Sequence, residues 1–208
     1  MFDVDGTLVK SYKFDEQCYI AAISETLGHS VDSNWNEYRH VTDSGILSEH
    51  LERKNILTGH DKIHRDVKAC FIKKVKEHLS HNRALETNGA NAFISKLKAL
   101  DFVSLSIATG GWQETALLKL ESAGIDITGI HLASSDDHYS RTEIMTLAKE
   151  KAGVKPHCRL TYFGDAEWDK RACTELGYNF ILVGNRIQHE KTVKDLTNIN
   201  LALSLIGI

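Results

Sequence analysis

The chain has 208 residues, of which 42% are hydrophobic and 25% are charged, and its formal net charge is −3. This balance excludes an intrinsically disordered chain, and because no long basic run is present we do not expect nucleic acid as a partner. Neither a signal peptide nor a run of about 18 apolar residues is visible, so we predict a cytoplasmic protein with no membrane partner.

The first 84 residues begin with a very short apolar strand, Met1-Phe2-Asp3-Val4, which ends at Asp5-Gly6-Thr7. From about residue 12 to residue 84 the apolar residues recur at helical spacing, and no good strand is visible. This part therefore predicts a bundle of roughly four helices, one of which is capped by Asp43 or Ser44.

From residue 85 onward, helices alternate with short apolar strands. We predict strands over 102–108, 130–133, 160–163 and 180–183. The predicted helices cover 89–99 and three later segments, which end before Gly124, near Gly153 and at Gly177. The third of these four helices opens with Ser140-Arg141-Thr142-Glu143, which has the form of a capping box. Such alternation predicts a parallel sheet, whose active site lies beyond the carboxyl ends of the strands.

Three polar clusters stand at the ends of predicted strands. Asp3 and Asp5 follow the first strand, Thr109-Gly110-Gly111 follows the second, and Gly164-Asp165 follows a later one, with Asp169 one helical turn on. Two neighbouring carboxylates repel each other and favour a cation, and free N–H groups at a helix start favour an anionic oxygen. Each cluster alone could be a plain turn or helix cap. Their agreement at three strand ends predicts an active site.

In this order the clusters resemble the motifs of the haloacid dehalogenase superfamily. Phe2-Asp3-Val4-Asp5-Gly6-Thr7-Leu8 resembles motif I, Ile107-Ala108-Thr109-Gly110 resembles motif II, Arg141 resembles the basic residue of motif III, and Gly164-Asp165 with Asp169 resembles motif IV. The resemblance implies an α/β fold: a Rossmann-like parallel sheet core with an inserted α-helical cap of the C1 type, as in phosphoglycolate phosphatase and β-phosphoglucomutase. The core would cover 1–11 and 85–208 and the cap 12–84.

The same resemblance implies a Mg²⁺-dependent phosphohydrolase that acts on a small phosphomonoester. Asp3 would be the nucleophile, which carries an aspartyl-phosphate, and Asp5 would transfer protons. Mg²⁺ would be held by Asp3, by the backbone carbonyl of Asp5, and by Asp165. Because the dehalogenases of the superfamily lack an acid at the position of Asp5, phosphoryl chemistry is favoured.

The remaining motif residues would support the phosphate. Thr109, Gly110 and Arg141 would bind the phosphoryl oxygens, and Asp169 would orient both the metal site and Arg141. Without the resemblance, Arg141 at a helix N-terminus could equally be a surface ion pair.

Three features depart from the family pattern. Motif III is usually Lys, so Lys149 and Lys151 are alternatives to Arg141. Ala166 stands where the family often has Gly. Only Met1 and Phe2 precede Asp3, so either the central strand is shortened or the sequence begins too late.

Substrate choice should come from the loop Arg39-His40-Val41-Thr42-Asp43-Ser44-Gly45, where His40, Thr42 and Asp43 are the candidates; the alternative is a plain helix-capping turn. The sequence leaves other activities open: a phosphotransferase or phosphomutase on a sugar phosphate, a phosphonatase with Lys54 as its amine, or a catalytically idle binding module. The partner we expect is a small phosphorylated metabolite, and we expect a monomer or a small homo-oligomer.

Overall fold

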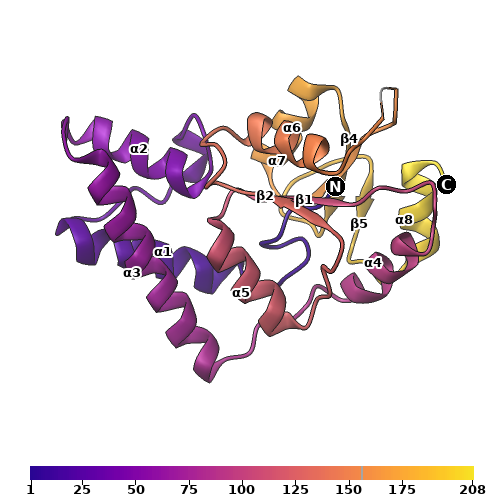
Figure 1. Ribbon diagram of the computed structural model, residues 1–208, viewed down its shortest axis with the longest axis horizontal. Coiled ribbons are helices and arrows are strands. Elements are labelled where there is room, and N and C mark those ends of the chain that lie inside the picture. The colour runs from indigo at the N-terminus through magenta and orange to yellow at the C-terminus, as the bar shows by residue number, and fades with distance from the viewer. Residues whose placement is uncertain (156) are drawn as a thin grey trace.

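The computed structural model describes residues 1–155 and 157–208, and in these residues short parallel strands form a central sheet (Figure 1). The strands are β1 (Ser106–Ala108), β2 (His131–Ala133), β3 (Thr161–Gly164), β4 (Asn179–Val183) and β5 (Thr192–Val193). Phe2 pairs in parallel with Ile107 of β1 on one side and with Phe163 of β3 on the other. The sheet therefore runs in the order β2, β1, Phe2, β3, β4, β5.

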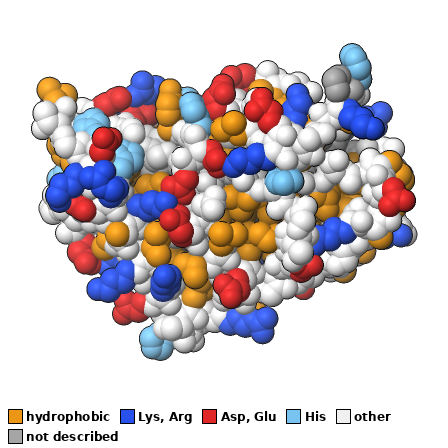
Figure 2. All heavy atoms as spheres, in the orientation of Figure 1, with side chains coloured by type: hydrophobic (Ala, Val, Ile, Leu, Met, Phe, Trp, Pro, Cys, Tyr) orange, Lys and Arg blue, Asp and Glu red, His pale blue; other side chains and the backbone are white. Residues whose placement is uncertain are grey.

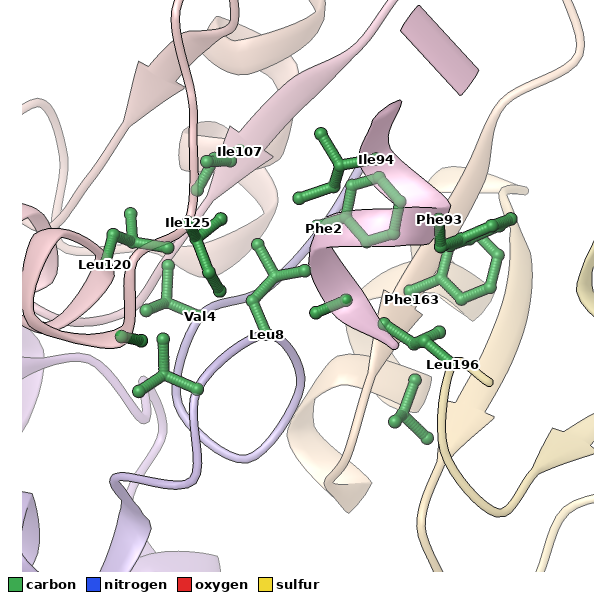
Figure 3. Close-up of a cluster of buried hydrophobic side chains, with 14 of the residues drawn as sticks. Phe2, Val4, Leu8, Phe93, Ile94, Ile107, Leu120, Ile125, Phe163 and Leu196 are labelled. Carbon is green, nitrogen blue, oxygen red and sulfur yellow. The ribbon is translucent and has the colours of Figure 1, made fainter. Parts of the chain in front are cut away.

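Helices cover both faces of this sheet. On one side lie α4 (Ala90–Lys98), α5 (Gln113–Ala123) and α8 (Ile199–Ile206), and on the other lie α6 (Arg141–Lys151) and α7 (Glu167–Leu176). Successive strand residues point to opposite faces, as they must in a pleated strand. Ile107 and Phe163 belong to the core under α4, α5 and α8 (Figure 3), whereas Ala108 and Tyr162 belong to the core under α6 and α7.

The segment from α1 to α3, residues 12–81, forms a separate layer that we call the helical unit. It contains α1 (Tyr12–Leu27), the 3₁₀ turn η1 (Trp35–Glu37), α2 (Asp43–Arg53) and α3 (His60–His81), and it lies at the left of Figure 1. Its buried side chains, among them Ile23, Leu47 and Phe71, form a core of their own. Three α-helices and one 3₁₀ turn thus stand where roughly four helices were predicted.

The predicted fold class, an α/β fold with a Rossmann-like parallel sheet, is confirmed, but three local predictions were wrong. β1 covers only the last three residues of the predicted strand 102–108, because Met1–Asp3 offers it no earlier partner. The N-cap of α2 is Thr42, whose Oγ1 accepts from Gly45 N–H at 3.0 Å. Ser140 forms no capping box, since its hydroxyl bonds with that of Thr142.

Both signs of charge are mixed on the one face of the molecule that Figure 2 shows. On this face, acidic and basic side chains are interspersed, with apolar side chains exposed between them. Within 1–155 and 157–208, no helix combines the length and the apolar character that a membrane crossing needs. The elements β5 and α8 follow the last predicted strand and had no counterpart in the sequence analysis.

Candidate active site

The first residues of the chain are held between two strands, and this places Asp3 at the end of the sheet. Phe2 N–H donates to Ser106 at 3.0 Å, and Asp3 N–H donates to Phe163 at 2.9 Å. Asp3 is only 5% exposed. The turn that follows requires glycine at Gly6, because its φ is +83° and a Cβ there would lie 2.2 Å from Asp165 Oδ2.

Three buried carboxylates meet at this point. One oxygen from each of Asp3, Asp165 and Asp169 lies within 4.8 Å of the other two. Burial, and next the carboxylate of Asp169, raise the pKa of Asp3 well above its usual value. The same two causes raise the pKa of Asp165 to about 6. Such a site holds its charge at neutral pH only if cations are near.

Arg141 supplies one of these cations. Its Nη1 lies 2.8 Å from Asp169 Oδ1 and 3.7 Å from Asp3 Oδ1, and its Nη2 donates to the carbonyl of Val41 at 3.0 Å. Its Nε is buried and has no hydrogen-bond partner among the described residues. Lys151, one of the alternatives for motif III, instead pairs with Asp137 at 2.6 Å on the surface.

The side chain of Asp5 is not part of the carboxylate trio. Its Oδ2 lies 2.6 Å from the ammonium of Lys119, and its Oδ1 accepts a hydrogen bond from the hydroxyl of Ser11. The carboxylate that completes the trio is that of Asp169, in the first turn of α7. Asp169 Oδ2 also accepts from the N–H groups of Asp165 and Ala166, at 3.1 and 3.2 Å.

The loop after β1 brings small residues against Arg141. Thr109 is buried, and its Oγ1 accepts from Gly111 N–H at 3.1 Å, which leaves its O–H free to donate. A Cβ on Gly110 would lie 2.4 Å from Arg141 Nη2. Glycine is therefore required here for the guanidinium to pass close to the backbone.

The predicted specificity loop docks directly onto this site. Asp43 N–H donates to Gly110 at 2.8 Å, Asp43 Oδ2 accepts from Trp112 N–H at 2.8 Å, and the Thr42 hydroxyl donates to the carbonyl of Tyr139 at 2.6 Å. Burial, and next the carboxylate of Asp15, raise the pKa of Asp43 well above its usual value.

A cavity lies between the helical unit and the carboxyl ends of the strands. The sheet side contributes motif residues other than Asp169, and the helical unit contributes Thr42 and Asp43 together with carboxylates and aromatic rings. His40 lies outside this cavity and packs edge-on against the ring of Tyr139, with centroids 5.0 Å apart. Lys54, the candidate amine of a phosphonatase, is exposed at the end of α2 and does not line the cavity.

Comparison with known proteins identifies the family of this chain. A model described as haloacid dehalogenase-like hydrolase matches residues 1–183. The chain belongs to this family. The predicted relationship and the predicted class of enzyme, a hydrolase, are therefore confirmed. No curated protein matches the sequence significantly.

Solved structures share the fold of this haloacid dehalogenase-like hydrolase. A hydrolase from Pseudomonas syringae has 21% identity and a TM-score of 0.75, covering 98% of this chain and 96% of its own. A β-phosphoglucomutase from Clostridium difficile has 15% identity and a TM-score of 0.74, covering 99% and 95%. CbbY from Rhodobacter sphaeroides, solved with phosphate, has 16% identity and a TM-score of 0.71, covering 95% and 94%. At these identities the likeness concerns the fold.

Two cations of this hydrolase were missed by the sequence analysis. Arg186, which follows β4, lies 2.6 Å from Asp165 Oδ2 and stacks over the ring of Tyr12, 3.8 Å from its centroid. Its position just past a strand end was the available signal. Lys119 falls on the apolar stripe of α5, where a charged residue is out of place, and this break in the pattern was the signal for it.

Proposed function

We propose that this protein is a Mg²⁺-dependent phosphohydrolase that acts on a small phosphomonoester through an aspartyl-phosphate intermediate. The observation that carries the proposal is the buried trio Asp3, Asp165 and Asp169, with the guanidinium of Arg141 beside it. Buried carboxylates this close repel one another unless a cation is shared between them. Membership of a hydrolase family supports the same chemistry.

The donor set fits Mg²⁺ well, because the converging ligand atoms are all carboxylate oxygens. Asp3 and Asp165 would hold the ion together with the backbone carbonyl of Asp5. Asp169 would keep Arg141 and the backbone after β3 in place. When bound, the ion would neutralise charge on the phosphoryl group.

The chain's own residues would carry the two half-reactions. In the first, an oxygen of Asp3 bonds to phosphorus, the bond from phosphorus to the leaving oxygen breaks, and Asp5 gives that oxygen a proton. In the second, Asp5 takes a proton from water, the water oxygen bonds to phosphorus, and the bond between Asp3 and phosphorus breaks. The product is inorganic phosphate, and Asp3 is regenerated.

Two donors on the sheet side suit the phosphoryl oxygens. The O–H of Thr109 is free to donate because its oxygen already accepts from Gly111. The Nε of Arg141 is buried without a partner in the described part of the chain. Fixed donors in a buried site stabilise charge that develops during phosphoryl transfer. We further propose that the helical unit acts as the cap over this site, since its residues line the same cavity.

The test is the release of inorganic phosphate from p-nitrophenyl phosphate by the purified protein. We expect turnover with Mg²⁺, loss of turnover with EDTA, and recovery when Mg²⁺ is added back. Ca²⁺ is the matched control, because it prefers more ligands at longer distances and should restore little activity. Turnover that resists EDTA would contradict the metal requirement. No turnover of this ester, of sugar phosphates or of phosphoglycolate would contradict the phosphohydrolase itself.

A further inference from the structure

Lys119 is a lysine whose side chain has no exposed surface, and it lies in the middle of α5. Its neighbours on the same side of the helix, Ala116 and Ala123, are buried and apolar. The ammonium reaches two carboxylates: Nζ lies 2.6 Å from Asp5 Oδ2 and 2.7 Å from Asp15 Oδ1. A charge thus stands where the helix would otherwise bury an aliphatic side chain.

Stability alone does not explain this arrangement. Moving an ammonium from water into the protein interior costs several kcal/mol. A protein in which apolar side chains of similar volume replace a buried ion pair is often equally stable. A leucine or methionine would continue the apolar stripe of α5. The role of Lys119 is therefore to be sought in what it does to its two partners.

The first partner, Asp5, is held at both of its oxygens. Oδ2 accepts from Lys119, and Oδ1 accepts from the hydroxyl of Ser11. The held carboxylate lies beside the loop after β1, which we propose binds phosphate, because a Cβ on Gly111 would be 3.7 Å from Asp5 Oδ2 and 3.5 Å from Thr109 Oγ1. Lys119 thereby fixes where the carboxylate of Asp5 lies relative to that loop.

The second partner, Asp15, belongs to the helical unit. It stands in the first turn of α1, and its side chain lines the cavity of the candidate site. Lys119 comes from α5, which packs on the sheet. A single ammonium therefore joins the helical unit, the sheet side and the side chain of Asp5.

We propose that Lys119 is a positioning residue that holds the carboxylate of Asp5 in place for the half-reaction in which it takes a proton from water, and that links this placement to α1 through Asp15. The proposal rests on the proposed function, in which Asp5 is the acid and base. With α1 placed as it is in this structure, the ammonium contacts both carboxylates, and Asp5 Oδ2 lies close to Gly111 of the loop after β1. Catalytic groups depend on support of this kind, because small misplacements lower the rate strongly.

The experiment compares Lys119→Met with a matched control, Lys68→Met. Methionine keeps the length of the stem and removes the charge. Lys68 of α3 also joins the helical unit to the sheet side, through Asp136 and through Glu114 at 2.8 Å, but it does not line the cavity. We expect Lys119→Met to lower kcat about 10–100-fold with little change in KM, and Lys68→Met to leave kcat nearly unchanged.

A double-mutant cycle with Asp5→Asn separates positioning from a merely structural role. If Lys119 acts through Asp5, Lys119→Met should lower kcat in the wild-type background and change it by less than about twofold in the Asp5→Asn background. Asp15→Asn provides the second variant, because it keeps the pair between Lys119 and Asp5 and removes only the link to α1. It should give an intermediate loss of kcat, also absent in the Asp5→Asn background. If Lys119→Met folds poorly, the same comparison is made with the double variant Lys119→Met and Asp15→Asn, which removes the lysine together with one of its two carboxylates.

The outcomes are distinct for the two proposals. Equal losses from Lys119→Met in both backgrounds, or no loss in an active protein, would overturn the role of Lys119 and leave the phosphohydrolase standing. An unmodified protein that turns over no phosphate ester, or one in which Asp5→Asn is fully active, would overturn the proposed function and the role of Lys119 with it.

Discussion

Asp3 has to be ionised to act as a nucleophile, yet its surroundings disfavour its charge. Burial and the carboxylate of Asp169 both raise its pKa. The guanidinium of Arg141, 3.7 Å away, acts in the opposite direction. A divalent cation at the carboxylate trio would add to that effect. At the residue scale, nearby cations are what keeps the nucleophile of this acidic cluster ionised.

Asp3→Asn keeps the size of the side chain and removes the attacking charge, so we expect phosphate release at background level. Asp5→Asn should keep the nucleophile and lose proton transfer, which contributes about 10²–10⁴-fold in many enzymes. Both variants are measured with p-nitrophenyl phosphate and Mg²⁺, alongside thermal melts that check folding. An Asp3→Asn protein with substantial turnover would show that another residue attacks phosphorus.

We predict that Arg141 both holds the site together and binds phosphate. Comparing Arg141→Lys with Lys149→Ala tests whether Arg141 or Lys149 is the basic residue of motif III. Lysine cannot reproduce the forked contacts of Arg141 with Asp169 and Val41. We expect kcat/KM to fall about 10²-fold, the usual scale for losing one donor to developing charge. Lys149→Ala should be nearly silent in the same phosphate-release assay. The reverse pattern would place motif III at Lys149.

At the scale of elements, the central segment of the sheet is short, and its neighbour β1 is shorter than predicted. The amino group of Met1 is buried and donates to the carbonyl of Thr161 at 2.9 Å. Beyond this point Val103 and Leu160 line an apolar groove, and Phe102 beside it is 72% exposed. Burial lowers the pKa of the Met1 amino group to about 5. The edges of this groove have backbone groups and apolar side chains that a longer strand would engage.

An extension of four apolar residues ahead of Met1 should therefore raise the melting temperature. It would add ladder hydrogen bonds and cover apolar surface, and an unmade buried hydrogen bond costs about 1–3 kcal/mol. The control is an extension of the same length made of glycine and serine, which adds no apolar burial. Equal melting temperatures for the two extended proteins would show that the groove does not accept a strand.

The same variant makes a pH prediction. The Met1 amine has a pKa of 8.0 when unfolded and about 5 when folded, so between these values the unfolded chain binds more protons. As far as this amine is concerned, the free energy of unfolding is therefore highest above pH 8 and decreases as the pH falls toward 5. The apolar extension removes the buried amine, so its stabilising effect, measured by urea unfolding, should be larger at pH 5 than at pH 8. Other titrating groups are common to both proteins and cancel in the difference.

At the scale of the whole molecule, the two sides of the cavity differ in the cations that they present. Among the described residues that line it, the only cations are Arg141 and Arg186, and both come from the sheet side. Arg186 is already paired with Asp165 at 2.6 Å. The helical unit contributes the carboxylates of Asp15 and Asp43, together with Glu16 and aromatic rings. A leaving group that faces the helical unit thus meets acidic side chains and aromatic rings, and no cation from that unit among the described residues.

We therefore expect a preference for esters whose alcohol carries no negative charge. Three substrates of similar size test this: 2-hydroxyethyl phosphate, 2-aminoethyl phosphate and 2-phosphoglycolate. The values of kcat/KM should be lowest for 2-phosphoglycolate, because in the described part of the chain no cation from the helical unit lines the cavity to pair with its carboxylate. Rates are compared at fixed ionic strength, since salt screens interactions between charges. A preference for 2-phosphoglycolate would mean that the cavity presents a cation to the leaving group.

Much of the site could be predicted from the sequence because it depends on strand order alone. Parallel strands end at one edge of a sheet, so Asp3, Thr109 and Asp165 had to meet once their strands were recognised. Arg141 was predicted only through the resemblance to the family motifs, because its place at the start of a helix fitted a surface ion pair equally well. The family motifs record the same geometry, and the match over residues 1–183 agrees with it.

Only the tertiary structure decided which side chains from elements far apart in the sequence contact each other. The ion pair of Lys119 with Asp5 joins residues 114 positions apart, and the pair of Arg186 with Asp165 depends on how the chain turns after β4. The length of β1 was also decided there, because a strand extends only as far as its partner does. Periodicity reports which face of an element is buried, whereas packing determines which side chain it meets.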